Sequence, residues 1–263
     1  MHVVAAILAS LLVAYLVVVQ PPRGVWGYRR LVRALPDHPE LRLRYYVRSV
    51  RRQWIGVALV GCVGLLSGMG PRTIGLLTSS RFRFDQGLAV YDIVLILIGA
   101  PLGIVLLRRA QAKGGRRMSR PLRGAVWLLP TSQTERRTFV AVALTAGICE
   151  EIGYRGFLMS YFLWAFPHAG TALDVVLAAV VFGLGHAYQG TVGIAGTAFM
   201  GLVLGSLYVG AGTLLVPILW HVLVDLRLLL VPDTIIDQLR AETLAPPPPD
   251  RGQWPPTAGS GAA

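Results

Sequence analysis

Long runs of apolar residues, separated by short polar or basic segments, constrain the fold of this chain more than any other feature. Residues from about 2 to 20 contain no charged side chain, and about 20 mostly apolar residues suffice for one helical membrane span. Charged residues make up 14% of the chain and its mean hydropathy is +0.58, whereas soluble domains carry about 25% charged residues. The sequence therefore predicts an all-α fold, a polytopic transmembrane bundle of about seven to eight helices.

Glycine, proline and polar segments mark the ends of the individual helices. The helix that contains Glu135 in its first turn is preceded by Thr131-Ser132-Gln133, a typical N-terminal signal. Glycines within 192–209 are spaced for close helix–helix approach in lipid. The predicted helices cover about residues 2–20, 54–69, 88–107, 139–166, 173–188, 192–209 and 214–231.

The chain is predicted to contain three regions. Residues 1–134 form N-terminal transmembrane helices with basic cytoplasmic loops, and residues 135–232 form the helical core that contains the candidate site. Residues 233–263 are predicted to be a disordered, cytoplasmic tail, because proline, glycine and alanine dominate it after Leu244.

The formal net charge of +12 comes almost entirely from arginine. These arginines concentrate in residues 23–52 and 108–137, between apolar runs, so membrane topology and anionic lipid explain them better than nucleic acid does. For residues 23–52, an amphipathic helix on the membrane surface and a solvated loop are both compatible with the pattern. The arginine distribution predicts an outward N-terminus and a cytoplasmic C-terminus in a bacterial inner membrane.

Several ionisable residues nevertheless lie within the predicted spans. They occur in three stretches, Glu150-Glu151-Ile-Gly-Tyr-Arg155, Phe182-Gly-Leu-Gly-His186 and His221-Val-Leu-Val-Asp225. A charged side chain at the centre of a bilayer costs at least about 2.5–3.5 kcal/mol on insertion scales. The clustering of these groups on three helices at similar depth therefore predicts a buried polar site.

The spacing of these residues indicates which of them can pair with each other and which are free to act on a water. Glu151 and Arg155 are four residues apart and can pair on one helix face, which leaves Glu150 free to act as a general base toward water. His221 and Asp225 are also four residues apart, so the carboxylate can orient the imidazole. His186, His221, Asp225 and Glu150 can bind one divalent metal such as zinc, or they can hold a water without metal. Both schemes lead to hydrolysis of an acyl bond.

These three motifs, in this order, resemble those of the CPBP family of intramembrane proteases. That family includes CAAX prenyl endopeptidases of the Rce1 type and the Abi group linked to bacteriocin processing. Its pattern is Glu-Glu-x-x-x-Arg, Phe-x-x-x-His and His-x-x-x-Asn or Asp. Residues 135–232 carry the resemblance, and Asp225 stands where Asn is common in the family.

The resemblance implies an intramembrane endopeptidase of the metalloprotease or glutamate type. Glu150 would activate the water, with His186, His221 and Asp225 positioning the water or a metal, and with Glu151 and Arg155 in supporting positions. The expected partners are a protein or peptide substrate and membrane lipid. Two alternatives stay open from the sequence: a proton- or cation-coupled transporter, and a membrane scaffold without catalytic activity.

Overall fold

The computed structural model describes residues 3–76 and 124–244, and all regular secondary structure in these two ranges is helical. The predicted helix at 88–107 and most of the second arginine-rich segment, residues 108–137, lie outside the described residues. The α-helices are α1 (Val3–Ala14), α2 (Gln20–Ala34), α3 (Leu41–Leu66), α7 (Gln133–Glu151), α8 (Met159–Ala165), α9 (Thr171–Gly185), α10 (Gly190–Ala211), α11 (Leu215–Leu226) and α12 (Asp233–Leu244). Short π-helical segments join α1 to α2 (Tyr15–Val19) and α7 to α8 (Ile152–Leu158), and 3₁₀ turns cover Val126–Leu128, Ala187–Gln189 and Arg227–Leu230.

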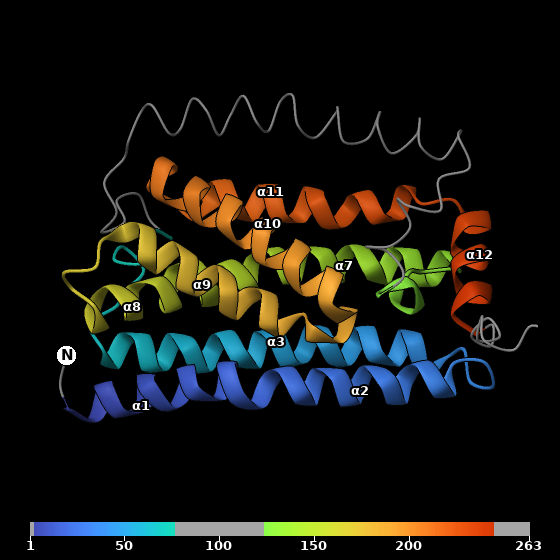
Figure 1. The fold of residues 1–263 in the computed structure, drawn as a ribbon, viewed down its shortest axis with the longest axis horizontal. Helices are drawn as coiled ribbons and strands as arrows, with labels where there is room; N and C mark the ends of the chain where they lie inside the picture. Colours follow the sequence, from blue (N-terminus) through green and yellow to red (C-terminus); the bar gives the residue numbers. More distant parts are fainter. Residues whose placement is uncertain (1–2, 77–123, 245–263) are drawn as a thin grey trace, which may run out of the picture.

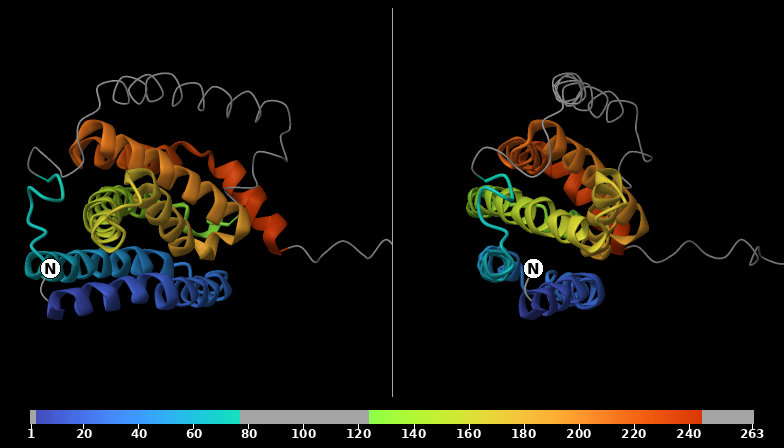
Figure 2. Two further views of the ribbon diagram at one scale, coloured as in Figure 1. Left: turned by 60° about the vertical axis from the view of Figure 1, so that its left-hand side comes forward. Right: turned by 90° about the vertical axis from the view of Figure 1, so that its left-hand side faces the viewer.

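The long helices lie roughly along one common direction, in layers (Figure 1). The rod formed by α1 and α2 lies beside α3, while α7, α8 and α9 occupy the middle, with α10 and α11 on the far side (Figure 2). The turn at residues 35–40, the 3₁₀ turn after His186 and α12 lie at one end of the bundle (Figure 1). The opposite end contains the start of α1 and the connections at 166–170 and 212–214.

Three helical stretches in the described ranges are long and apolar enough to cross a membrane. They are Val3–Ala34, Leu41–Leu66 and Ala187–Ala211. The bent pair formed by Leu215–Leu230 and Asp233–Thr243 adds a fourth if it is taken as one span. The helical fold is therefore confirmed for the described residues, several of whose helices are apolar enough to span a membrane, whereas the count of about seven to eight spans stays a prediction.

Residues 23–52 form most of α2, the turn at residues 35–40 and the start of α3. α3 therefore begins at Leu41 rather than near Trp54. Arg42 shows why an arginine-rich sequence is helical here. Its guanidinium is buried, donates to the carbonyl of Trp127 and forms an ion pair with Glu135 at 3.0 Å. Glu135 also completes the predicted N-terminus of α7, where it forms a capping box with Ser132.

The predicted disordered tail was wrong at its start. Residues Asp233–Leu244 form α12, which packs against the turn at Val126–Leu128. Ile236 and Leu239 of this helix are buried, and Arg240 donates to the carbonyl of Leu129. These tertiary contacts stabilise a helix whose composition is too polar to indicate a membrane span. The rest of the predicted tail, residues 245–263, lies outside the described residues.

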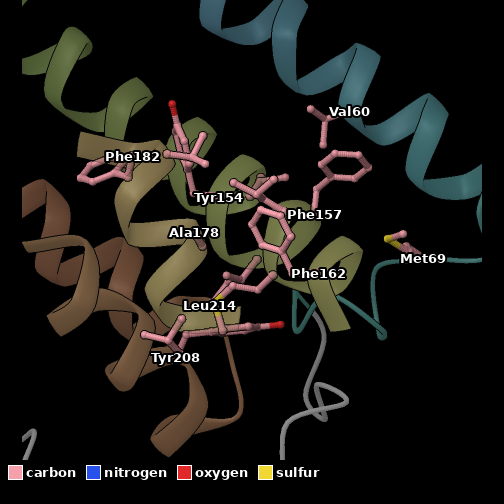
Figure 3. Packing of buried hydrophobic residues seen from close by; sticks show 14 of the residues in the cluster. Val60, Met69, Tyr154, Phe157, Phe162, Ala178, Phe182, Tyr208 and Leu214 are labelled. Atoms are coloured by element: carbon pink, nitrogen blue, oxygen red, sulfur yellow. The ribbon is translucent and has the colours of Figure 1, made fainter. Parts of the chain in front are cut away.

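Two clusters of buried apolar side chains hold the bundle together. The larger one lies among α1, α3, α8, α9 and α10 and includes Phe157, Phe162, Phe182 and Tyr208 (Figure 3). The smaller one joins α2, the 3₁₀ turn at Val126–Leu128 and α12, and it includes Leu31. Tyr154 and Phe182 lie in the larger cluster, and Tyr188 packs against the smaller one. The candidate site borders both clusters.

Glycine lets α9 and α10 pack closely, as their spacing predicted. A Cβ atom on Gly201 would lie 2.9 Å from Cα of Ala179, and one on Gly205 would lie equally close to a methyl group of Val175. Gly196, in contrast, has nothing within 4 Å of the same position. The close approach therefore depends on some of the predicted glycines and not on others.

We expect Gly201→Ala to destabilise the protein by about 1–3 kcal/mol, because the new methyl group would force two helix backbones apart. Gly196→Ala is the matched control on the same helix. It should be neutral or slightly stabilising, since alanine favours helix by up to about 1 kcal/mol over glycine. Thermal unfolding of both variants in detergent tests this difference, and equal melting temperatures would contradict it.

Candidate active site

The three motifs meet where α7, α9 and α11 come together. Glu150 and Glu151 end α7, and Arg155 lies in the π-helical segment that follows. His186 caps the C-terminus of α9, and His221 and Asp225 lie on α11. Single π-helical turns inside α-helices are frequent at functional sites, because the wider turn changes the direction of the side chains.

Glu151 and Arg155 form the predicted ion pair in the interior of the bundle. Their atoms Oε1 and Nη1 are 2.6 Å apart, and the side chains are 0% and 1% exposed. Arg155 also donates to the carbonyl of Gly201, and its guanidinium lies 4.6 Å from the ring centre of Phe182. Burial of two charges is costly unless they are paired and hydrogen-bonded, so this network explains how the helix accommodates both.

The same oxygen of Glu151 also binds His221. Nδ1 of His221 lies 2.7 Å from Oε1 of Glu151. A carboxylate only accepts, so Nδ1 donates and the imidazole presents Nε2 on its other side. Glu151, and not the predicted Asp225, therefore makes the contact that orients this ring. Oδ2 of Asp225 is 3.8 Å from Nε2 of His221, beyond hydrogen-bond distance, and its side chain is 28% exposed.

His186 is oriented by the backbone of its own helix. Its Nδ1 lies 2.9 Å from the carbonyl oxygen of Phe182, which fixes Nδ1 as the donor. The ring also packs on Phe182, with 4.7 Å between the ring centres. Phe182 is therefore a packing residue that holds the imidazole of His186 in place.

Both imidazoles present Nε2 to the same carboxylate oxygen. Oε2 of Glu150 is 3.9 Å from Nε2 of His186 and 3.9 Å from Nε2 of His221. This oxygen is buried and has no hydrogen-bond partner among the described residues. Polar atoms separated by more than about 3.5 Å are often bridged by a water. The geometry thus suits one water held between Glu150 and the two rings.

Two amide side chains from the N-terminal helices also face this region. Gln53 of α3 lies with its amide nitrogen 3.4 Å from Oε1 of Glu150. Gln20, at the start of α2, interacts with the hydroxyl of Tyr154. Neither residue was predicted to be part of the site. The signal was nevertheless present, because each is a lone amide beside an apolar run, and polar side chains within spans commonly mark functional cavities.

The four predicted metal ligands approach one another without forming a complete ligand set. Within residues 3–76 and 124–244, no group of three or more His, Cys, Asp or Glu side chains is arranged to hold a metal ion. The bond from Nδ1 of His221 to Glu151 leaves Nε2 of this ring free, and Nε2 lies 3.9 Å from Glu150 and 3.8 Å from Asp225. Binding of a metal by these residues therefore stays a prediction.

The fold and the site together define a helical membrane protein with a buried glutamate–histidine centre. Residues 133–227, from α7 to α11, match the family model described as type II CAAX prenyl endopeptidase Rce1-like. The match supports the resemblance to the CPBP/CAAX protease family that the three motifs predicted, and it supports a protease that acts on a protein or peptide. Neither the curated proteins nor the solved structures gave a match.

Proposed function

We propose that this protein is an intramembrane endopeptidase of the CAAX protease type, in which Glu150 activates a water to hydrolyse a peptide bond. The observation that carries the proposal is the approach of two oriented imidazoles, at 3.9 Å each, to one carboxylate oxygen that has no hydrogen-bond partner among the described residues. A general base, a site for the water and donors for the developing negative charge are the minimum for hydrolysis of an amide.

In the proposed reaction, Glu150 takes a proton from the water, and the resulting hydroxide attacks the carbonyl carbon of the substrate. The carbonyl π electrons move to the oxygen, whose negative charge is stabilised by a protonated Nε2 of His221 or His186. Collapse of this intermediate breaks the C–N bond, and the proton held by Glu150 passes to the leaving amine. Glu151 and Arg155 act through His221, because Glu151 fixes the orientation of its ring.

The charge distribution supports the proposed topology. The turn at residues 35–40 lies between two arginine-rich helix ends, and α12 lies at the same end of the bundle. Basic residues favour the cytoplasmic side, which supports a topology with this end inside the cell and the N-terminus outside. In a bacterial inner membrane, the substrate peptide would then meet Glu150 toward the cytoplasmic half of the bilayer.

The test uses the full chain in liposomes, with peptides that carry an apolar segment and a polar tail, in water enriched in ¹⁸O. We expect cleavage, with one ¹⁸O atom in each newly formed carboxylate, because the attacking oxygen comes from water. Mass spectrometry of the products measures both the cleavage site and the label. New termini without the label would point to a different nucleophile, and the absence of any cleavage would favour the transporter or scaffold alternatives.

A further inference from the structure

A groove outside the glutamate–histidine site lies between α2 and α3, near the end of the bundle that contains the turn at 35–40. Its volume is about 540 Å³, and its lining includes Trp26, Arg30, Leu31, Tyr45, Arg48 and Arg52. We propose that this groove binds one anionic phospholipid, with the phosphate against the arginines and an acyl chain against the apolar wall.

The charge of the groove is unbalanced. Arg30, Arg48 and Arg52 line it, and no acidic residue is among the lining residues. The ion pairs of the described residues involve other arginines, namely Arg42, Arg136 and Arg155. None of these three guanidinium groups pairs with a carboxylate within residues 3–76 and 124–244. Like charges that line one groove repel one another, and a bound phosphate would relieve this repulsion.

The remaining lining residues favour an amphiphile over a water-soluble anion. Leu31 and Leu41 provide apolar surface. The guanidinium of Arg30 lies over the ring of Trp26, 5.6 Å from the ring centre. Trp26 is 66% exposed although it is a large apolar side chain. Tryptophan and tyrosine are enriched at the level of lipid headgroups, where one side of the ring contacts chains and the other contacts polar groups.

The position of the groove fits the cytoplasmic leaflet, which carries the anionic lipids. Basic pockets between helices on that side bind lipid headgroups in other membrane proteins. This step rests on the proposed topology but not on the proposed hydrolysis. Arg52 also directly precedes Gln53, whose amide contacts Glu150, so a bound lipid would lie on the helix that supplies one wall of the candidate active site.

Trp26 lines the groove and is therefore a fluorescent probe of what binds there. The chain has six tryptophans, so the signal of Trp26 must be separated from that of the others. Fluorescence quenching is measured for the full chain in zwitterionic vesicles containing brominated phosphatidylglycerol or, separately, brominated phosphatidylcholine. The signal of Trp26→Phe is subtracted to isolate Trp26. We expect at least about tenfold tighter quenching by the anionic lipid, since each arginine near the membrane surface contributes to binding of anionic headgroups.

The variant R30Q/R48Q/R52Q should lose this preference, whereas the matched control R29Q/R44Q/R51Q, which removes the same charge from residues outside the groove lining, should keep it. Equal losses in both variants would show general surface attraction and overturn the proposal. Release of the quenching by millimolar inorganic phosphate would also overturn it, in favour of a soluble anion. If the triple variant does not fold, R30Q and R29Q repeat the comparison. Glu150→Gln should bind the lipid normally, which separates this result from the proposed hydrolysis.

Discussion

Replacement of Glu150 by glutamine is expected to lower the rate of peptide cleavage by about 10²–10⁴-fold, the usual contribution of a general base. Glutamine has the shape of glutamate but cannot take a proton from water. The fold should remain intact or become slightly more stable. Oε2 of Glu150 is buried without a hydrogen-bond partner among the described residues, and burial of a polar atom in this way opposes folding.

The measurement compares initial cleavage rates and melting temperatures of the wild type, Glu150→Gln and Glu40→Gln. Glu40 is exposed at the start of α3, far from the motifs in the sequence, and provides the same chemical change on the surface. The control should retain full activity. Cleavage by Glu150→Gln at a rate close to that of the wild type would show that Glu150 does not activate the water, and it would contradict the proposed function.

Replacement of Arg155 by leucine should have the largest effect on stability. It leaves the carboxylate of Glu151 buried and 0% exposed, without its cation, and breaking a buried ion pair in this way typically costs about 3–5 kcal/mol. It also removes the donor to the carbonyl of Gly201 on α10. Unfolding of the purified protein in detergent, followed by circular dichroism, measures the loss.

The double variant Glu151→Leu/Arg155→Leu separates the structural role of the pair from its role at the site. Removal of both charges leaves no uncompensated ion, so stability should recover in large part. Activity should not recover, because His221 has then lost the carboxylate that binds its Nδ1. Full activity in the stable double variant would contradict the positioning role that we assign to Glu151.

Local sequence patterns predicted the apolar helices of the described residues better than the polar ones. The spans followed from composition, because lipid requires about 20 apolar residues per helix. The start of α3 and the whole of α12 could not be found in this way, since their helices are arginine-rich or mixed in composition. They depend on contacts distant in the sequence, such as the ion pair of Arg42 with Glu135 and that of Arg136 with Asp233.

The candidate site shows the same division. The pairing of Glu151 with Arg155 follows from a separation of four residues on one helix and could be predicted. The bond between Glu151 and His221 joins residues 70 positions apart, and that between Gln53 and Glu150 joins residues 97 positions apart. Such contacts depend on how whole helices pack and on which face each helix turns toward its neighbour. The spacing of residues within one motif contains no information on the packing or on these faces.

The position of Gln53 has a consequence for how this protein can be divided. The match to the protease family begins at residue 133, yet the amide that contacts Glu150 and the guanidinium that pairs with Glu135 both come from α3. A shortened protein consisting only of the matched segment would expose these carboxylates to lipid or solvent. We therefore expect the smallest unit able to work on its own to retain α3.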